Sequence, residues 1–149
     1  MHESATMEAL RLYAAPAPIT FTASQRSGTA CVWCERELQE REGIALGGPP
    51  PWRPQGCVPC CERQIQALQT YLDWYHHGVR CRRCPRGSCE RAGALQRAHL
   101  DAQQRAGAPP PWCVECWDVI LPGAAARPIL WQGLRGLVFS YVHVCACSR

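Results

Sequence analysis

The sequence predicts a small α+β protein stapled by metal ions, with short helices and strands arranged around paired cysteines. Three observations predict this fold class. Cysteine accounts for 12 of the 149 residues, a density typical of disulfide-rich or metal-binding scaffolds. Most of these cysteines stand in pairs separated by two residues. The chain also contains 13 prolines and 12 glycines, which disfavour one large apolar core and indicate that cross-links supplement burial.

The predicted cellular compartment decides whether these cross-links are disulfides or metal ions. The N-terminal Met1-His2-Glu3-Ser4 has no basic segment of a secretory signal, and no apolar run reaches the roughly 18 residues of a membrane span. We therefore expect a cytoplasmic protein with no membrane partner and with reduced thiols. Repeated C-x2-C pairs in that compartment indicate metal. We expect about three Zn²⁺ ions per chain, or two if the last site fails to form.

The net charge is a weak indicator of a partner. The formal charge is +4, but about three zinc ions and their thiolate ligands would bring it to roughly −1 or −2. All 16 basic residues are arginine, a bias typical of GC-rich genomes. The abundance of arginine therefore does not by itself indicate phosphate binding, and local clusters of charge are the more useful signal.

In chain order, residues 1–28 are predicted to be a flexible N-terminal tail, because Pro16, Pro18 and a Ser/Thr/Gly-rich stretch interrupt the short apolar run. A module over residues 29–106 follows. Its first cysteine pair is Cys31-Val32-Trp33-Cys34, and its second pair is Cys57-Val58-Pro59-Cys60. This spacing lies within the range of a four-thiolate zinc site, and the proline-rich residues 47–54 between the pairs form a loop.

A helix is predicted directly after the second cysteine pair, because apolar residues recur with helical spacing from Ile65 to Tyr75. A helix that starts at the second pair is the hallmark of the treble-clef zinc module. The predicted helix ends at Gly78, and a second helix spans residues 90 to about 106. The sequence thus predicts a treble-clef-like zinc module with two helices.

The first helix leads into a second ligand set of one histidine and three cysteines, a common structural zinc arrangement. The histidine is His77 or its neighbour His76; alternatively, both cap the C-terminus of the helix, where positive charge is favoured. Cys61 either completes one of the two sites or is a small buried residue. The predicted ligands of the second site are His77, Cys81, Cys84 and Cys89.

Residues 107–149 are predicted to form a zinc-ribbon-like β module. Gly107 and three prolines break the chain after the second helix, and a third C-x2-C pair follows them. A hairpin turn is predicted at residues 133–136, and a strand is predicted over residues 134–144. If the strand continues beyond residue 144, His143 lies on the same face as two further cysteines, because side chains two residues apart on a strand share a face. The predicted ligands are Cys113, Cys116, Cys145 and Cys147, and His143 could replace either of the last two.

Residues 31–89 resemble small, uncharacterised cysteine-rich zinc-binding proteins of high-GC, actinomycete-type bacteria. In that family a C-[IVL]-W-C knuckle precedes an aliphatic-x-L-G segment, a Trp-containing loop, G-C-x-P-C, a helix and three further cysteines. The matching residues here are Cys31-Val32-Trp33-Cys34, Ile44-Ala45-Leu46-Gly47, Trp52, Gly56-Cys57-Val58-Pro59-Cys60, Cys81, Cys84 and Cys89. The resemblance implies zinc binding in a treble-clef-like or knuckle-like module and no established activity. Residues 107–149 depart from the family pattern.

We expect a non-enzymatic zinc protein that acts as a structural or regulatory binding module for nucleic acid or a protein partner, because four protein ligands fill each predicted site. Nothing in the sequence identifies a catalytic residue or a small-molecule substrate. An arginine cluster around the second site is either a nucleic-acid contact or a solvated basic loop. It comprises Arg80, Arg82, Arg83, Arg86 and Arg91.

Two alternative functions stay open. The first is a zinc-dependent nuclease-like enzyme, but the chain has no asparagine, which nucleases of the His-metal finger type use in catalysis. The second is an iron–sulfur or redox regulator. The spacing of Cys81, Cys84 and Cys89 is similar to that of the WhiB-like regulators, although the G-[VI]-W-G-G turn of that family is missing.

Overall fold

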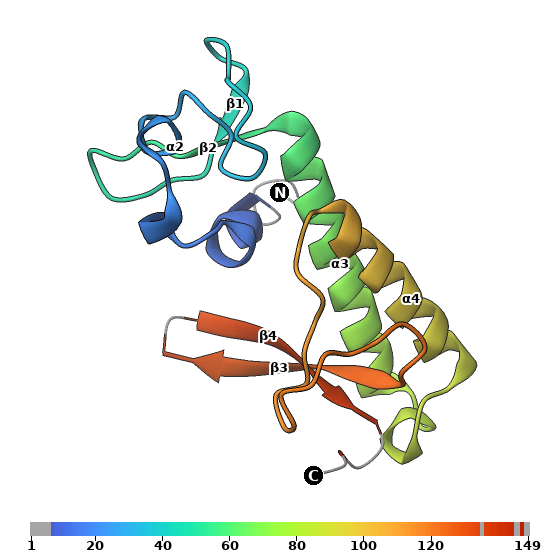
Figure 1. Cartoon of the computed structure of the whole chain (residues 1–149). Coiled ribbons are helices and arrows are strands. Elements are labelled where there is room, and N and C mark those ends of the chain that lie inside the picture. The colour runs from blue at the N-terminus through green and yellow to red at the C-terminus, as the bar shows by residue number, and fades with distance from the viewer. Residues whose placement is uncertain (1–6, 135, 145–146, 148–149) are drawn as a thin grey trace. The chain divides into compact units, whose positions relative to one another are not determined.

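The computed structural model describes residues 7–134, 136–144 and 147. It confirms a small α+β protein with two long helices and two separate two-stranded antiparallel sheets (Figure 1). The chain divides into two compact units, residues 1–66 and 67–149, and the boundary falls inside helix α3 (Val58–Arg80). We describe each unit by itself, as the N-terminal unit and the C-terminal unit.

The N-terminal unit is built on short elements. Within the predicted tail, the described residues form a π-helical turn (η1, Leu10–Ala14), a 3-10 turn (η2, Pro18–Thr20) and the helix α2 (Ala23–Ser27). Strands β1 (Gly43–Ala45) and β2 (Gln55–Cys57) pair antiparallel. The core of the unit consists of Leu10, Phe21, Val32, Leu46 and Cys61. Two of these residues come from the predicted tail, so apolar burial orders its described part.

Helix α2 is short but well capped. The Thr22 hydroxyl accepts from the N–H of Gln25, and the Gln25 side chain accepts from the N–H of Thr22, which together form a capping box. Gly28 ends the helix with φ +80°, in the left-handed region that favours glycine. The buried Gln25 amide also donates to the carbonyl of Val32 at 3.2 Å. The helix thereby fixes the first cysteine pair.

The C-terminal unit packs two helices against a hairpin. It contains the second part of α3, the 3-10 turn η3 (Cys84–Arg86), helix α4 (Glu90–Arg105), and strands β3 (Ala126–Gly133) and β4 (Gly136–His143). The strands pair antiparallel with Gly133 opposite Gly136, as the predicted hairpin turn requires. Its core joins α3 to the hairpin and to the segment before it, through Tyr71, Trp74, Cys113, Ile120, Ala126, Tyr141 and Val142.

Helix α3 continues two residues beyond the predicted end at Gly78. The N–H of Cys81 donates to the carbonyl of His77 at 2.9 Å, so the helical hydrogen-bond pattern runs through the glycine. A glycine ends a helix when it adopts a left-handed conformation, and Gly78 stays helical. The prediction of a helix with a stop at Gly78 was therefore right about the helix and wrong about its last turn.

A buried hydrogen-bond network links the two helices to β4. His99 on α4 is 2% exposed. Its Nδ1 lies 3.1 Å from the carbonyl of Ala67, and because a carbonyl only accepts, Nδ1 carries the proton. Its Nε2 therefore accepts from the Tyr141 hydroxyl at 2.7 Å, and the oxygen of that hydroxyl accepts from Gln103 at 2.7 Å. His99 is thus a structural residue of the core.

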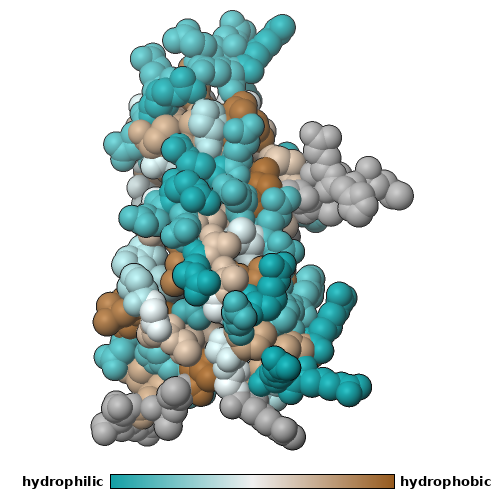
Figure 2. Space-filling view, turned by 90° about the vertical axis from the view of Figure 1, so that its right-hand side faces the viewer, coloured by the Kyte–Doolittle hydropathy of each residue, from teal (hydrophilic) through white to brown (hydrophobic). Residues whose placement is uncertain are grey.

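One face of the molecule is mainly polar. Figure 2 shows a face on which hydrophilic side chains predominate and apolar ones appear singly or in small groups. Over the part of the chain that the structure describes, none of the helices combines the length and the apolar character that crossing a membrane requires.

Candidate metal centres

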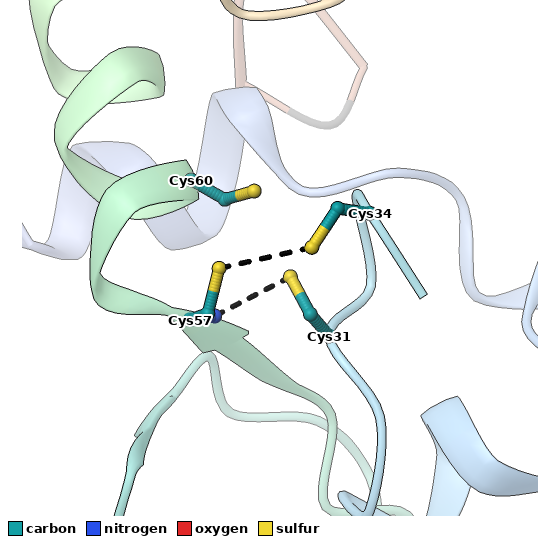
Figure 3. A group of neighbouring side chains, drawn as sticks. All are labelled: Cys31, Cys34, Cys57 and Cys60. Carbon is teal, nitrogen blue, oxygen red and sulfur yellow. Dashed lines mark hydrogen bonds between the residues drawn. The ribbon is translucent and has the colours of Figure 1, made fainter. Parts of the chain in front are cut away.

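The first candidate metal centre lies in the N-terminal unit and consists of Cys31, Cys34, Cys57 and Cys60. The first two residues belong to the loop after α2, Cys57 ends β2, and Cys60 lies in the first turn of α3. Figure 3 shows the four sulfurs pointing toward a common centre, and they lie within 4.8 Å of one another. All except Cys34 are buried. The structure thus brings together all four residues of the first predicted site.

Local hydrogen bonds position this centre. The N–H of Val32 donates to the carbonyl of Gln55 at 3.0 Å, which holds the first cysteine pair against β2. The N–H of Cys57 donates to Sγ of Cys31 at 3.3 Å, and the guanidinium of Arg63 donates to Sγ of Cys60 at 3.2 Å. Such donors favour thiolates over thiols.

The second candidate centre lies in the C-terminal unit and consists of His77, Cys81, Cys84 and Cys89. Nε2 of His77, in the last turn of α3, lies 3.1 Å from Sγ of Cys89. Cys89 also caps α4, because its sulfur accepts from the N–H of Ala92 at 3.4 Å. All four residues are half-buried, so this centre is open to solvent on part of its surface.

The third candidate centre consists of Cys113, Cys116, His143 and Cys147. The third cysteine pair lies beside β4, where the N–H of Val114 donates to the carbonyl of Tyr141 at 3.0 Å. Nδ1 of His143, the last residue of β4, lies 3.4 Å from Sγ of Cys116. The sequence left three ligand sets open, with His143 in place of Cys145, in place of Cys147 or in place of neither, and the described residues bring together the first of these. Cys145, the other predicted ligand, lies outside the described residues.

The sulfur separations fit one metal ion in each cluster. Zinc–thiolate bonds of about 2.3 Å in a tetrahedron place the sulfurs about 3.8 Å apart, whereas a disulfide requires about 2.05 Å. The separation is 3.8 Å for Cys34–Cys57, 3.9 Å for Cys81–Cys89 and 3.6 Å for Cys113–Cys147. None of the 11 described cysteines forms a disulfide. Each cluster can therefore hold a metal ion with no change in its fold.

In each centre, the cysteine that comes first in the sequence has a lowered pKa. Burial acts to raise the pKa of Cys31 and Cys113, but backbone N–H donors outweigh it and lower the values to about 7 and about 6. Backbone N–H donors likewise lower the pKa of Cys81. In contrast, burial raises the pKa of Cys60 to about 12 and that of Cys84 to about 11. Each centre thus contains one readily ionised thiol, and metal binding must release protons from thiols with a raised pKa, such as Cys60 and Cys84.

The remaining candidate ligands lie outside the clusters. Cys61 is 1% exposed in the core of the N-terminal unit, and burial raises the pKa of its thiol to about 11. His76 is exposed and its ring packs against the Tyr75 ring with centroids 5.9 Å apart. Of the two alternatives for Cys61, the structure therefore places it in the core, as a small buried residue.

The arginine cluster lies around the second centre. Arg82 and Arg83 occupy the turn between Cys81 and Cys84, and both are exposed. Arg80 and Arg91 are exposed as well, and the side chain of Arg86 lies outside the description. Among the described side chains, Arg36–Glu42 is the single ion pair, so none of these arginines has a carboxylate partner there.

An exposed aromatic pair near the third centre was not anticipated from the sequence. The rings of Trp112 and Trp117 stack with centroids 4.8 Å apart and an interplanar angle of 14°. Trp117 directly follows the second cysteine of its pair and has φ +66°; Glu35 holds the equivalent position after Cys34, with φ +60°. The position itself was the signal that could have identified Trp117, since this turn directs the side chain outward.

Comparisons of the chain with models of known protein families, with curated protein sequences and with solved structures gave no match. The function is therefore inferred from the three candidate centres and from the surfaces around them.

Proposed function

We propose that the protein is a zinc-stapled binding module without a catalytic centre of its own. The observation that carries this proposal is the composition of the clusters: in each, four cysteine or histidine ligand atoms lie within 4.8 Å of one another. Four protein ligands complete the coordination of structural zinc, whereas catalytic zinc keeps one position for water. Zinc is the favoured ion because thiolate and imidazole ligands in tetrahedral sets suit it.

The topology supports assigning the modules to known zinc folds. In the N-terminal unit a cysteine turn, the β1–β2 hairpin and the start of α3 surround the first centre, which is the order of elements in a treble clef. The third centre joins a cysteine turn to the end of the β3–β4 hairpin, as in a zinc ribbon. Membership of the small cysteine-rich zinc proteins of high-GC bacteria, and a reducing cytoplasmic location, belong to the same proposal.

The ligand geometry favours zinc over an iron–sulfur cluster. A cluster distributes its thiolates over several iron atoms, whereas ligand atoms this close together can all bind a single ion. A nuclease-like enzyme is also disfavoured, because four protein ligands in each set leave no position on the metal for a nucleophilic water.

Metal analysis with native mass spectrometry of protein purified without oxygen tests this proposal. We expect about three zinc ions per chain and no absorbance near 400 nm. Cys57→Ala should lose one ion, and the control Cys61→Ala should retain all of them. A coloured, iron-containing protein, or a zinc-free protein with intact disulfides, would refute the proposal.

The exposed arginines favour nucleic acid as one partner. Four guanidinium groups without carboxylate partners among the described side chains surround the second centre, and arginine binds phosphate through paired donors. If they bind phosphates, Arg82→Ala combined with Arg83→Ala should weaken binding to single-stranded oligonucleotides. It should also reduce the slope of log K against log salt by about 1.4, or 0.7 for each phosphate that is no longer neutralised.

The matched control replaces Arg97 and Arg105, which are exposed on α4 outside the cluster. These substitutions change the net charge equally and should leave most of the binding intact. Equal losses for the two double variants would show that binding follows net charge alone and would remove the arginine cluster as a nucleic-acid site.

A further inference from the structure

The segment between α4 and β3 carries an exposed aromatic surface that the metal centres do not require. The stacked Trp112 and Trp117 are 44% and 72% exposed, and Val119 and Leu121 are 48% and 63% exposed. Trp112 and Val119 form an isolated antiparallel bridge, so the two are neighbours in space. We call these four residues the tryptophan surface.

Trp117 occupies a position that disfavours a large side chain. Its N–H donates to the carbonyl of Cys113 at 2.9 Å, which closes the turn and holds φ at +66°. A bulky residue in the left-handed region costs about 1–2 kcal/mol relative to glycine. The indole recovers little of this by burial, since 72% of the residue stays exposed. Stacking on Trp112 offsets part of this cost, and the fold gains little else from a tryptophan at this position.

The charge around this surface selects a cationic ligand. Glu115 and Asp118 are exposed and lie within two residues of Trp117 in the sequence, which has no basic residue between Arg105 and Arg127. The faces of indole rings attract arginine and lysine cations. Both the carboxylates and the ring faces disfavour phosphate, so this surface has the opposite preference to the arginine cluster.

A groove adjoins the tryptophan surface. It has a volume of about 670 Å³ and lies between α4 and residues 108–125, and one basic and one acidic side chain, Arg97 and Asp101, are among those that line it. Val119 and Leu121 belong to both features, and Pro109–Pro111 form part of the groove wall. A chain bound across the tryptophans can therefore continue into a mainly apolar channel.

We infer that the tryptophan surface and its adjoining groove bind an extended basic peptide. An arginine or lysine side chain lies over the exposed face of Trp117 and pairs with Asp118, and neighbouring aliphatic side chains enter the groove. This goes beyond the proposed zinc module and its nucleic-acid contact, because it assigns a protein partner to a different surface of the C-terminal unit.

Binding of the zinc-loaded full chain to an array of random nonapeptides tests the inference, with equal numbers of basic, acidic and neutral peptides and with single-stranded DNA oligomers. We expect enrichment of peptides that combine arginine or lysine with aliphatic residues. No enrichment, or preference for acidic peptides, would overturn the inference. Preferred binding of DNA at this surface, abolished by Trp117→Asn, would overturn it as well.

Substitutions then locate the site on the best peptide. Asparagine tolerates the left-handed conformation, so Trp117→Asn should retain its metal and melt at an equal or higher temperature while binding about tenfold more weakly. Asp118→Asn should weaken binding several-fold and lower its salt dependence, whereas Asp73→Asn, an exposed acid on α3, and Trp131→Ala on β3 should change binding less than twofold. Unchanged peptide binding by Trp117→Asn would refute the inference. Metal content is measured for every variant, so that a failure of the zinc proposal, seen as missing metal, is distinguished from a failure of the peptide site.

Discussion

Burial of His99 makes the stability of the C-terminal unit dependent on pH. The side chain is 2% exposed, and burial lowers its pKa to about 4 from about 6.5. The titratable side chains that face it are Tyr71 and Tyr141, and burial raises both of their pKa values far above neutral pH. The imidazole is therefore neutral in the folded protein, with its proton on Nδ1.

The sign of the effect follows from proton uptake. The unfolded chain takes up a proton at His99 near pH 6.5, whereas the folded chain resists it until about pH 4. The contribution of neutral His99 to the free energy of unfolding is therefore fully present above pH 6.5 and is lost as the pH falls toward 4. Between pH 7 and pH 5 the predicted loss in the free energy of unfolding is about 2 kcal/mol.

Urea unfolding with excess zinc at pH 7, 6 and 5 measures this loss. The comparison is with His99→Gln, a polar variant that does not titrate and shares the metal centres and carboxylates of the wild type. The variant is less stable at pH 7, because the hydrogen bonds to Ala67 and Tyr141 are disrupted. The difference in the free energy of unfolding between the wild type and the variant should narrow by about 2 kcal/mol between pH 7 and pH 5. A constant gap would refute the reasoning.

Three further predictions follow from the packing of single residues. Tyr141→Phe leaves Nε2 of His99 and the amide of Gln103 without partners and should cost about 2–4 kcal/mol in urea unfolding. Gly56→Ala places a methyl group against the Trp33 ring and 2.7 Å from Sγ of Cys61, so it should lower the free energy of unfolding by about 1–3 kcal/mol. The control Gly78→Ala has open space around its Cβ and should not lower the free energy of unfolding. Cys61→Ser should lower the melting temperature without changing metal content, whereas Cys60→Ser should release one metal ion per chain. Loss of metal from the Cys61 variant would contradict the place of Cys61 in the core.

The grouping of the twelve ligand atoms into three clusters was predicted from the sequence only in part. Spacing alone predicted the cysteines of the first two sites, because a C-x2-C turn closes on its own backbone and brings its two sulfurs together wherever it occurs. It left His76 and His77 as alternatives in the second site and Cys61 as an alternative ligand of either site, and the structure decided both. For the third site, spacing predicted four cysteines and left His143 as a replacement for either Cys145 or Cys147. The described residues bring His143 to within 3.4 Å of Cys116, which depends on where β4 ends beside the third cysteine pair.

The sequence by itself determined the features that a few neighbouring residues encode: the cysteine turns, the helix after Cys60, and the hairpin at residues 133–136. Tertiary structure alone decided that Cys61 and Leu10 share a core and that Trp117 stacks on Trp112 at the surface. The physical reason is the range of the interactions involved. Turns and helices form through hydrogen bonds between residues close in sequence. Burial depends on which distant segments of the chain pack together, and the spacing of residues does not indicate which segments these are.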